Sequence, residues 1–136
     1  MGILCDFLVG DDATAAAYDG SNVAEVDRAD WKGLTCDVLG GLRAALASDV
    51  ALHHIDDFDW IEAADGGESI ALRFPADFVG ALAAADGDAL GRAISEWATD
   101  ELGFDDDAAA DIVADLVRLA KRARKTGRNL YVWNSP

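Results

Sequence analysis

The densest group of side chains that could do chemistry lies between residues 49 and 59. Its members are two adjacent histidines and four aspartates: Asp49, His53, His54, Asp56, Asp57 and Asp59. Neutral imidazole nitrogen and anionic carboxylate oxygen are ordinary ligands of zinc and other divalent metals. A site built from Asp49, His53, His54 and Asp57 would make the protein a small metal-dependent enzyme, which is the alternative hypothesis for its function.

The spacing of these residues argues against one shared metal ion. His53 and His54 are neighbours in the sequence. On an extended chain their side chains point to opposite faces and reach the same ion only if the backbone bends. The spacing also matches no zinc motif. An acidic loop that leads into an exposed strand edge is the simpler interpretation.

Other catalytic arrangements have less support in the sequence. Cys36 would act as a nucleophile only if folding placed it beside His53 or His54 and a cation stabilised its thiolate. Asp37 follows it directly, and a small buried cysteine is the commoner situation. The sequence contains neither a Walker-type phosphate loop nor a dinucleotide-binding glycine fingerprint. We therefore predict no catalytic residue and no cofactor.

The charge distribution favours a binding function. The 136 residues include 26 acidic and 11 basic ones, which gives a formal net charge of −15. All the acidic residues and only five basic ones lie in residues 1–117, and the other six basic residues lie in 118–128. Such a field repels nucleic acid and anionic membranes and attracts basic proteins. High-GC coding or adaptation to salt would produce the same acidity without any partner.

Aromatic residues beside acidic ones provide a candidate partner-binding surface. The run 56–60 combines three aspartates with a phenylalanine and a tryptophan, a combination that suits docking to a basic protein by charge steering followed by burial. A tryptophan in the irregular stretch before residue 34 would be a second anchor if it were exposed, although large aromatic residues more often pack against the core. The predicted partner-binding residues are Trp31, Asp56, Asp57, Asp59 and Trp60.

The hydrophobic pattern predicts a single α+β domain over residues 1–136. The nearly continuous apolar stretch 3–9 predicts a strand covered on both faces, and 128–134 predicts a strand rich in β-forming residues. An amphipathic helix precedes this last strand and ends at Gly127. Helices are also expected at 13–18, after Thr35, after Pro75 and after Asp86 or Asp88 up to Gly103, and a hairpin with its turn at 65–68.

The terminal strands are expected to lie side by side in a small sheet. This sheet also contains the central hairpin and packs against about five helices. Residues 21–34 show no clear period, so no strand is predicted there.

The sequence also predicts a compartment. Cys5 and Cys36 are the only cysteines, the start of the chain lacks a signal-peptide pattern, and no apolar run is long enough to span a bilayer. We therefore expect a cytoplasmic protein with two reduced thiols.

Three stretches together resemble a known group of proteins. They are MGILCDFLV at 1–9, DGGESIALRFP at 65–75 and GRNLYVWN at 127–134. They look like small uncharacterised bacterial proteins, and the general plan is more distantly similar to the YfbM-type domain of unknown function. The matching residues are mostly of core and turn types, so the resemblance implies a fold and a compartment. No functional residue is carried over from it.

The leading hypothesis is a cytoplasmic, non-enzymatic binding domain that engages a basic protein partner through the acidic surface around residues 56–60. Nucleic acid and membrane are not expected as partners, because neither a basic patch interleaved with aromatic residues nor a membrane span is present in the sequence.

Overall fold

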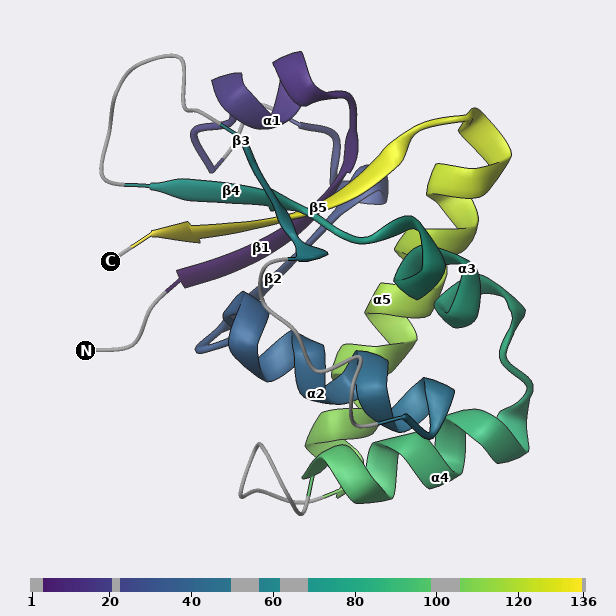
Figure 1. Ribbon diagram of the computed structural model, residues 1–136. Helices are drawn as coiled ribbons and strands as arrows, with labels where there is room; N and C mark the ends of the chain where they lie inside the picture. Colours follow the sequence, from purple (N-terminus) through teal and green to yellow (C-terminus); the bar gives the residue numbers. More distant parts are fainter. Residues whose placement is uncertain (1–3, 21–22, 50–56, 62–68, 99–105, 136) are drawn as a thin grey trace.

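Five strands form one antiparallel sheet in the computed structural model, which describes residues 4–20, 23–49, 57–61, 69–98 and 106–135 (Figure 1). The strands are β1 (Leu4–Gly10), β2 (Arg28–Lys32), β3 (Asp59–Ile61), β4 (Ile70–Arg73) and β5 (Asn129–Ser135). Their order across the sheet is β2-β1-β5-β4-β3. The predicted α+β fold, with adjacent terminal strands, is confirmed.

The terminal strands β1 and β5 occupy the middle of the sheet. They pair along their whole length, from Leu4 opposite Ser135 to Gly10 opposite Asn129. Every residue of β1 after Leu4 is buried. A central strand has neighbours at both edges and packing on both faces, which explains why its sequence is almost continuously apolar.

The helices cover the two faces of the sheet unequally. They are α1 (Asp12–Ala17), α2 (Cys36–Ala47), α3 (Ala76–Ala84), α4 (Gly87–Trp97) and α5 (Asp106–Thr126), with a short 3-10 helix η1 (Glu25–Asp27) before β2. Helices α2 to α5 lie on one face of the sheet and α1 lies on the other (Figure 1). The sheet therefore has one large core and one small one.

The large core is built on the apolar stripe of α5. Its residues Ile112, Leu116, Leu119 and Ala123 are at most 2% exposed, as the helical spacing predicts. They pack with alternate residues of the strands, because side chains along a strand point to opposite faces. The small core contains Tyr18, which lies perpendicular to the ring of Trp133 at a centroid distance of 5.0 Å.

Helix ends follow local capping chemistry. The side chain of Asp11 accepts from the backbone N–H of Thr14, and that of Asp86 accepts from the N–H of Ala89, each at 2.8 Å. Pro75 is the residue before α3, one position earlier than a first-turn proline. Gly127 adopts φ 67°, and the N–H of the next residue then donates back into the last turn of α5. The predicted stop at Gly103 and the hairpin turn at 65–68 lie outside the described residues.

Strand β2 is the element that the sequence pattern misses. It pairs with β1, from Lys32 opposite Leu4 to Arg28 opposite Leu8. Ala29 is buried in the large core, but a small residue between charged ones gives almost no periodic hydrophobic signal. Helix α5 adds the missing stabilisation, since Arg118 donates to the carbonyl oxygens of Val26 at 3.0 Å and Arg28 at 3.3 Å.

The described ranges contain no helix that could span a membrane. None of the helices there combines the length and the apolar composition that crossing a bilayer requires.

Two glycines predict opposite effects of substitution by alanine. A Cβ at Gly80, inside α3, would meet no atom within 4 Å, and glycine in a helix interior costs about 0.5–1 kcal/mol relative to alanine. We expect Gly80→Ala to raise the free energy of unfolding by about that amount in urea titrations. Gly127→Ala should lower it by about 1 kcal/mol, because an L residue is strained at positive φ. Effects of the same sign at both positions would contradict this reading.

Candidate functional site

The predicted partner-binding residues are divided between the two ends of the sheet. Asp59 and Trp60 lie on β3, and Asp57 comes shortly before it. Trp31 lies on β2, at the opposite end of the strand order. Asp56 lies outside the described residues. The structure therefore brings together Asp57, Asp59 and Trp60, which we call the β3 surface, and separates Trp31 from them.

The surroundings of Trp31 account for it structurally. The residue is half-buried and packs against the large core. Its indole Nε1 donates to Oδ2 of Asp115 on α5 at 3.0 Å. These contacts attach β2 to α5, and they leave only part of the indole ring available to a partner.

Trp60 has the opposite environment. Its side chain is 65% exposed, the largest value among the exposed large hydrophobic residues in the described ranges. Leu72 of β4 lies directly opposite it across the strand pair, and β3 is the last strand in the sheet order. An exposed tryptophan on an end strand is an ordinary anchor for a protein partner.

Arg43 neutralises part of the acidic charge near β3. Its side chain is buried, and its guanidinium donates to Oδ2 of Asp57 at 2.5 Å and to both oxygens of Asp77 at 2.9 and 3.0 Å. Burial alone would lower the pKa of Arg43, but the two carboxylates raise it above its ordinary value. This group, the Arg43 cluster, joins α2 to α3 and to the segment before β3.

Arg73 forms a second cluster of the same kind. Its Nη1 donates to both oxygens of Asp12 at 2.9 Å, and its Nη2 donates to Oδ2 of Asp59 at 2.7 Å. The Tyr131 hydroxyl also donates to Asp12, at 2.6 Å. The pKa of Asp12 is lowered, first by Tyr131 and then by Arg73. The Arg73 cluster joins α1, β4 and β3.

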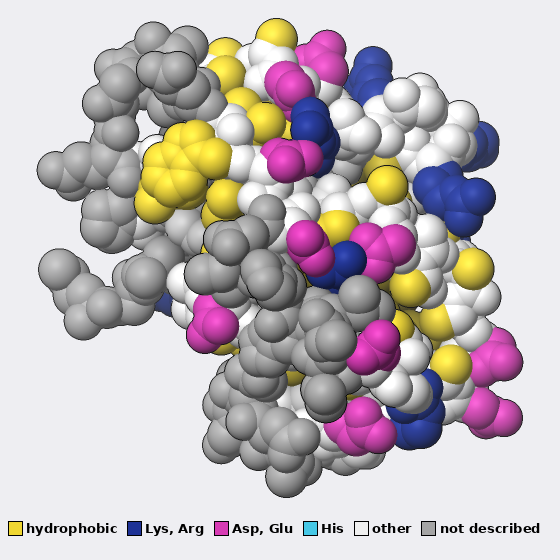
Figure 2. Space-filling model, viewed as in Figure 1, with side chains coloured by type: hydrophobic (Ala, Val, Ile, Leu, Met, Phe, Trp, Pro, Cys, Tyr) yellow, Lys and Arg dark blue, Asp and Glu magenta, His cyan; other side chains and the backbone are white. Residues whose placement is uncertain are grey.

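Asp57 and Asp59 are therefore structural as well as surface residues. Each cluster contains two carboxylates and one guanidinium, so each keeps an excess negative charge. Both carboxylates also stay accessible, with side chains 46% and 60% exposed. Figure 2 shows basic side chains lying between acidic ones on this face of the molecule, and a broad hydrophobic side-chain surface nearby.

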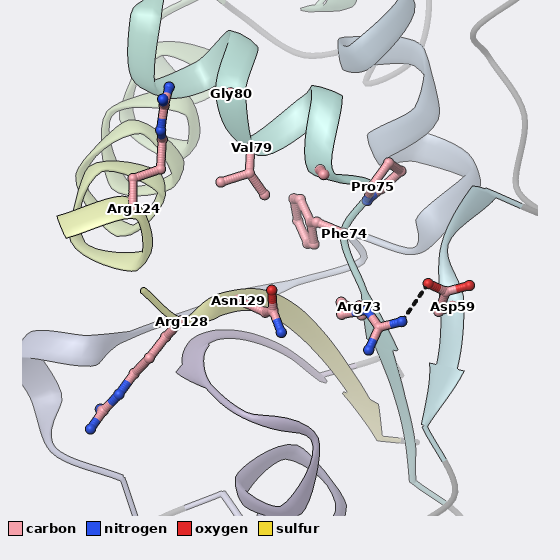
Figure 3. A pocket seen from close by; sticks show the side chains of 10 residues that line it. Asp59, Arg73, Phe74, Pro75, Val79, Gly80, Arg124, Arg128 and Asn129 are labelled. Carbon is pink, nitrogen blue, oxygen red and sulfur yellow. Dashed lines mark hydrogen bonds and ion pairs between the residues drawn. The ribbon is translucent and has the colours of Figure 1, made fainter. Parts of the chain in front are cut away.

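A cavity of about 550 Å³ adjoins the β3 surface, with which it shares Asp59, and it is also lined by Arg73 (Figure 3). Its other lining residues come from α3 and the two residues before it, from the last turn of α5, and from the turn that leads into β5 together with the first residue of that strand. Sequence reasoning missed this cavity because its walls come from segments far apart in the chain. The concentration of basic residues in 118–128 was the one available signal.

A buried carboxyl group occupies the other face of the sheet. Asp6 is 7% exposed and accepts from the Tyr18 hydroxyl at 2.5 Å. Arg28 donates to the same hydroxyl at 3.1 Å and to the Gly20 carbonyl at 2.5 Å. Burial raises the pKa of Asp6, and Asp30, directly opposite on β2, raises it further. This network ties α1 and β2 to β1.

The alternative metal hypothesis remains a prediction. His53 and His54 lie outside the described residues, Asp49 is exposed, and Asp57 belongs to the Arg43 cluster. Among the residues that the structure describes, no group of three or more His, Cys, Asp or Glu side chains is placed to hold a metal ion.

The two cysteines are free thiols with raised pKa values. Burial is the main cause for both, and Asp37 adds to the effect at Cys36. A raised thiol pKa keeps cysteine protonated at neutral pH and opposes nucleophilic attack.

Comparisons with protein-family models, curated proteins and solved structures give no match to this chain. The resemblance to the YfbM-type domain stays a prediction from the quoted stretches alone.

Replacing Arg43 tests the role of its cluster. Arg43→Met keeps much of the side-chain volume but removes three hydrogen bonds to carboxylates, so the free energy of unfolding should fall by about 2–3 kcal/mol. Arg92→Met is the matched control, because Arg92 is less buried, donates one hydrogen bond to the Ala45 carbonyl at 3.0 Å and pairs with Glu96 at 3.6 Å, and should cost about 1 kcal/mol. Urea unfolding of both variants measures the difference, and equal losses would refute a special role for Arg43.

Asp6→Asn tests the buried carboxyl group. The pKa of Asp6 is raised in the folded protein above its ordinary value of about 3.8, which applies to the unfolded chain. The wild type should therefore lose stability from this group as the pH rises above about 3.8. Asparagine keeps an oxygen acceptor for Tyr18 and does not titrate. The stability of Asp6→Asn relative to the wild type should therefore increase with pH, as measured by urea unfolding between pH 4 and 7. A difference that is constant over this range would contradict the assignment.

Proposed function

We propose that this chain is a cytoplasmic binding domain that engages an extended, basic segment of another protein through the β3 surface. The observation that carries the proposal is the position of Trp60, an exposed aromatic residue on an end strand that also carries Asp59, with Asp57 shortly before it. The cytoplasmic location is the expectation from the sequence.

Trp60 would supply most of the affinity. A tryptophan buries a large apolar area when a partner covers it, and interface energy is concentrated in such residues. The other exposed large hydrophobic residues of the described ranges are Leu4 and Val26, which are aliphatic and less exposed. Trp60 is therefore the best anchor among them.

The carboxylates would select a basic partner. Asp57 and Asp59 each share one arginine with a second aspartate, so both clusters retain negative charge on accessible oxygens. The formal net charge of −15 adds a field that accelerates the approach of cationic segments. Lysine or arginine side chains flanking an apolar residue would match this pattern.

The end position of β3 suggests how the partner lies. In the described part of the chain β3 pairs with β4 and with no other strand. An extended segment that adds to the free side would form main-chain hydrogen bonds and place alternate side chains over Trp60. Strand addition of this kind explains why a basic peptide, rather than a helix, is the expected ligand.

A synthetic peptide of alternating lysine and valine residues tests this proposal. In NMR titrations it should shift the indole N–H signal of Trp60 and the amides of residues 59–61 before other signals. Trp60→Ser should weaken binding about 10-fold or more, as expected for loss of an interface anchor. Raising the salt concentration from about 0.05 M to about 0.5 M should also weaken binding several-fold, because salt screens the attraction between charges.

Val26→Ser is the matched control, because Val26 is 62% exposed but belongs to η1. It should leave the affinity unchanged. Equal weakening by both substitutions, or shifts spread over all the acidic residues, would show diffuse charge attraction and overturn the proposed site.

A further inference from the structure

The eight arginines of the chain fall into two groups. Six of them contact a carboxylate at N–O distances of 2.5 to 3.6 Å: Arg28, Arg43, Arg73, Arg92, Arg118 and Arg122. In the described ranges, Arg124 and Arg128 form no ion pair. Acidic residues outnumber basic ones 26 to 11. Two nearby arginines without an ion pair are therefore unexpected, because carboxylates are present in excess.

Both unpaired arginines line the cavity of Figure 3. Arg124 stands on the last turns of α5 beside Gly80 of α3, and Asn129 at the start of β5 lies nearby (Figure 3). The guanidinium of Arg73 is directed to Asp59, with which it forms an ion pair. Its charge is already compensated, which leaves Arg124 and Arg128 as the uncompensated cations of the cavity.

The wall between these arginines and Arg73 is apolar. Phe74 and Val79 lie between Arg124 and Arg73 in Figure 3, and Phe74 is 3% exposed, which fixes its position. Gly80 adds open space, because a Cβ built there meets no atom within 4 Å. The cavity therefore offers an apolar surface beside an unpaired guanidinium.

We propose that this cavity binds an oxyanion, a phosphoryl or carboxylate group, carried on an apolar body. Arg124 is the main ligand for the oxyanion, because a guanidinium matches two oxygens of such a group at once. The apolar body lies against Pro75 and Val79, which are half-buried and line the cavity. This site adjoins the β3 surface at Asp59, but its ligand is an anion, and the recognition of a basic partner by Trp60 does not involve Arg124 or Arg128.

Arg128 would be the second cation. Its side chain extends away from Asn129 in Figure 3. The pKa of Asp11 is lowered mainly by its hydrogen bonds from Thr14, and the charge of Arg128 adds a smaller effect. Because Arg128 is exposed and forms no ion pair with any residue that the structure describes, turning it toward the cavity breaks no direct contact among those residues.

The rest of the molecule makes the location specific. A protein with a net charge of −15 repels anions over most of its surface. The six basic residues of 118–128 concentrate positive charge on the second half of α5 and the turn that follows it. An anionic ligand is therefore expected to gather at this end of the molecule.

Phenyl phosphate, benzoate and phenol are suitable probes, with inorganic phosphate as a probe without an apolar body. Binding is followed by NMR through the amide signals of Gly80 and Asn129. Phenyl phosphate or benzoate should bind more tightly than both phenol and inorganic phosphate. If phenyl phosphate binds more tightly than benzoate, the oxyanion of the natural ligand is a phosphoryl group, and if benzoate binds more tightly it is a carboxylate.

Substitutions on one helix separate a site from general charge. Arg124→Gln should weaken binding of the preferred anion about 10-fold and Arg128→Gln about 3-fold, as expected for removal of a charge-assisted contact. Lys125→Gln makes the same charge change on α5 at a residue outside the cavity lining, and should change the affinity less than about 2-fold.

A pair of substitutions at Gly80 gives an independent check. Gly80→Glu would place a carboxylate at the cavity wall and should abolish binding, whereas Gly80→Gln should retain part of it. Circular dichroism confirms that each variant is folded. Three outcomes would overturn the proposal. Lys125→Gln and Arg124→Gln could weaken binding equally, or no anion could bind at all. In the third outcome, neither phenyl phosphate nor benzoate binds more tightly than phenol and inorganic phosphate.

Discussion

Repulsion among carboxylates is the constraint that shapes this structure. With 26 acidic residues in 136, elements that pack together bring aspartates close to one another. The paired arginines are placed where this occurs. Arg43 holds α2, α3 and the segment before β3 together, Arg73 holds α1 to β4 and β3, and Arg122 of α5 binds Asp27 of η1. A small number of cations thus works as cross-links between elements.

This use of arginine changes how an acidic surface is interpreted. Asp57 and Asp59 would be counted from the sequence as free negative charges, yet each is held by a guanidinium. Their orientation is fixed by the fold before any partner arrives. Fixed carboxylates lose little conformational entropy on binding, which makes them better recognition groups than the same residues on a flexible loop.

The sequence predicts the fold where one physical signal dominates. The terminal strands are mostly apolar because they lie in the middle of the sheet, and α5 has a complete apolar stripe because one of its faces is buried. Strand β2 escapes prediction because its stability comes from pairing with β1 and from contacts with α5. Those contacts are between residues about 90 positions apart, so no local window contains them.

The candidate sites are less predictable for the same reason. The sequence places Trp60 and Trp31 in similar polar surroundings. Distant contacts, namely Asp115 and the large core, make Trp31 half-buried, whereas Trp60 is exposed. Partners of the arginines are equally remote, as with Arg73 and Asp12, which are 61 positions apart. The cavity beside α3 is lined by residues of β3, β4, α3, α5 and β5, so no single sequence motif corresponds to it.

The guanidinium of Arg118 has a consequence for self-association. It occupies carbonyl oxygens of Val26 and Arg28, where β2 begins at the outer end of the sheet. A neighbouring molecule that added a strand there would first have to displace it. Growth of the sheet between copies of this chain at the β2 end would therefore cost the two hydrogen bonds from Arg118.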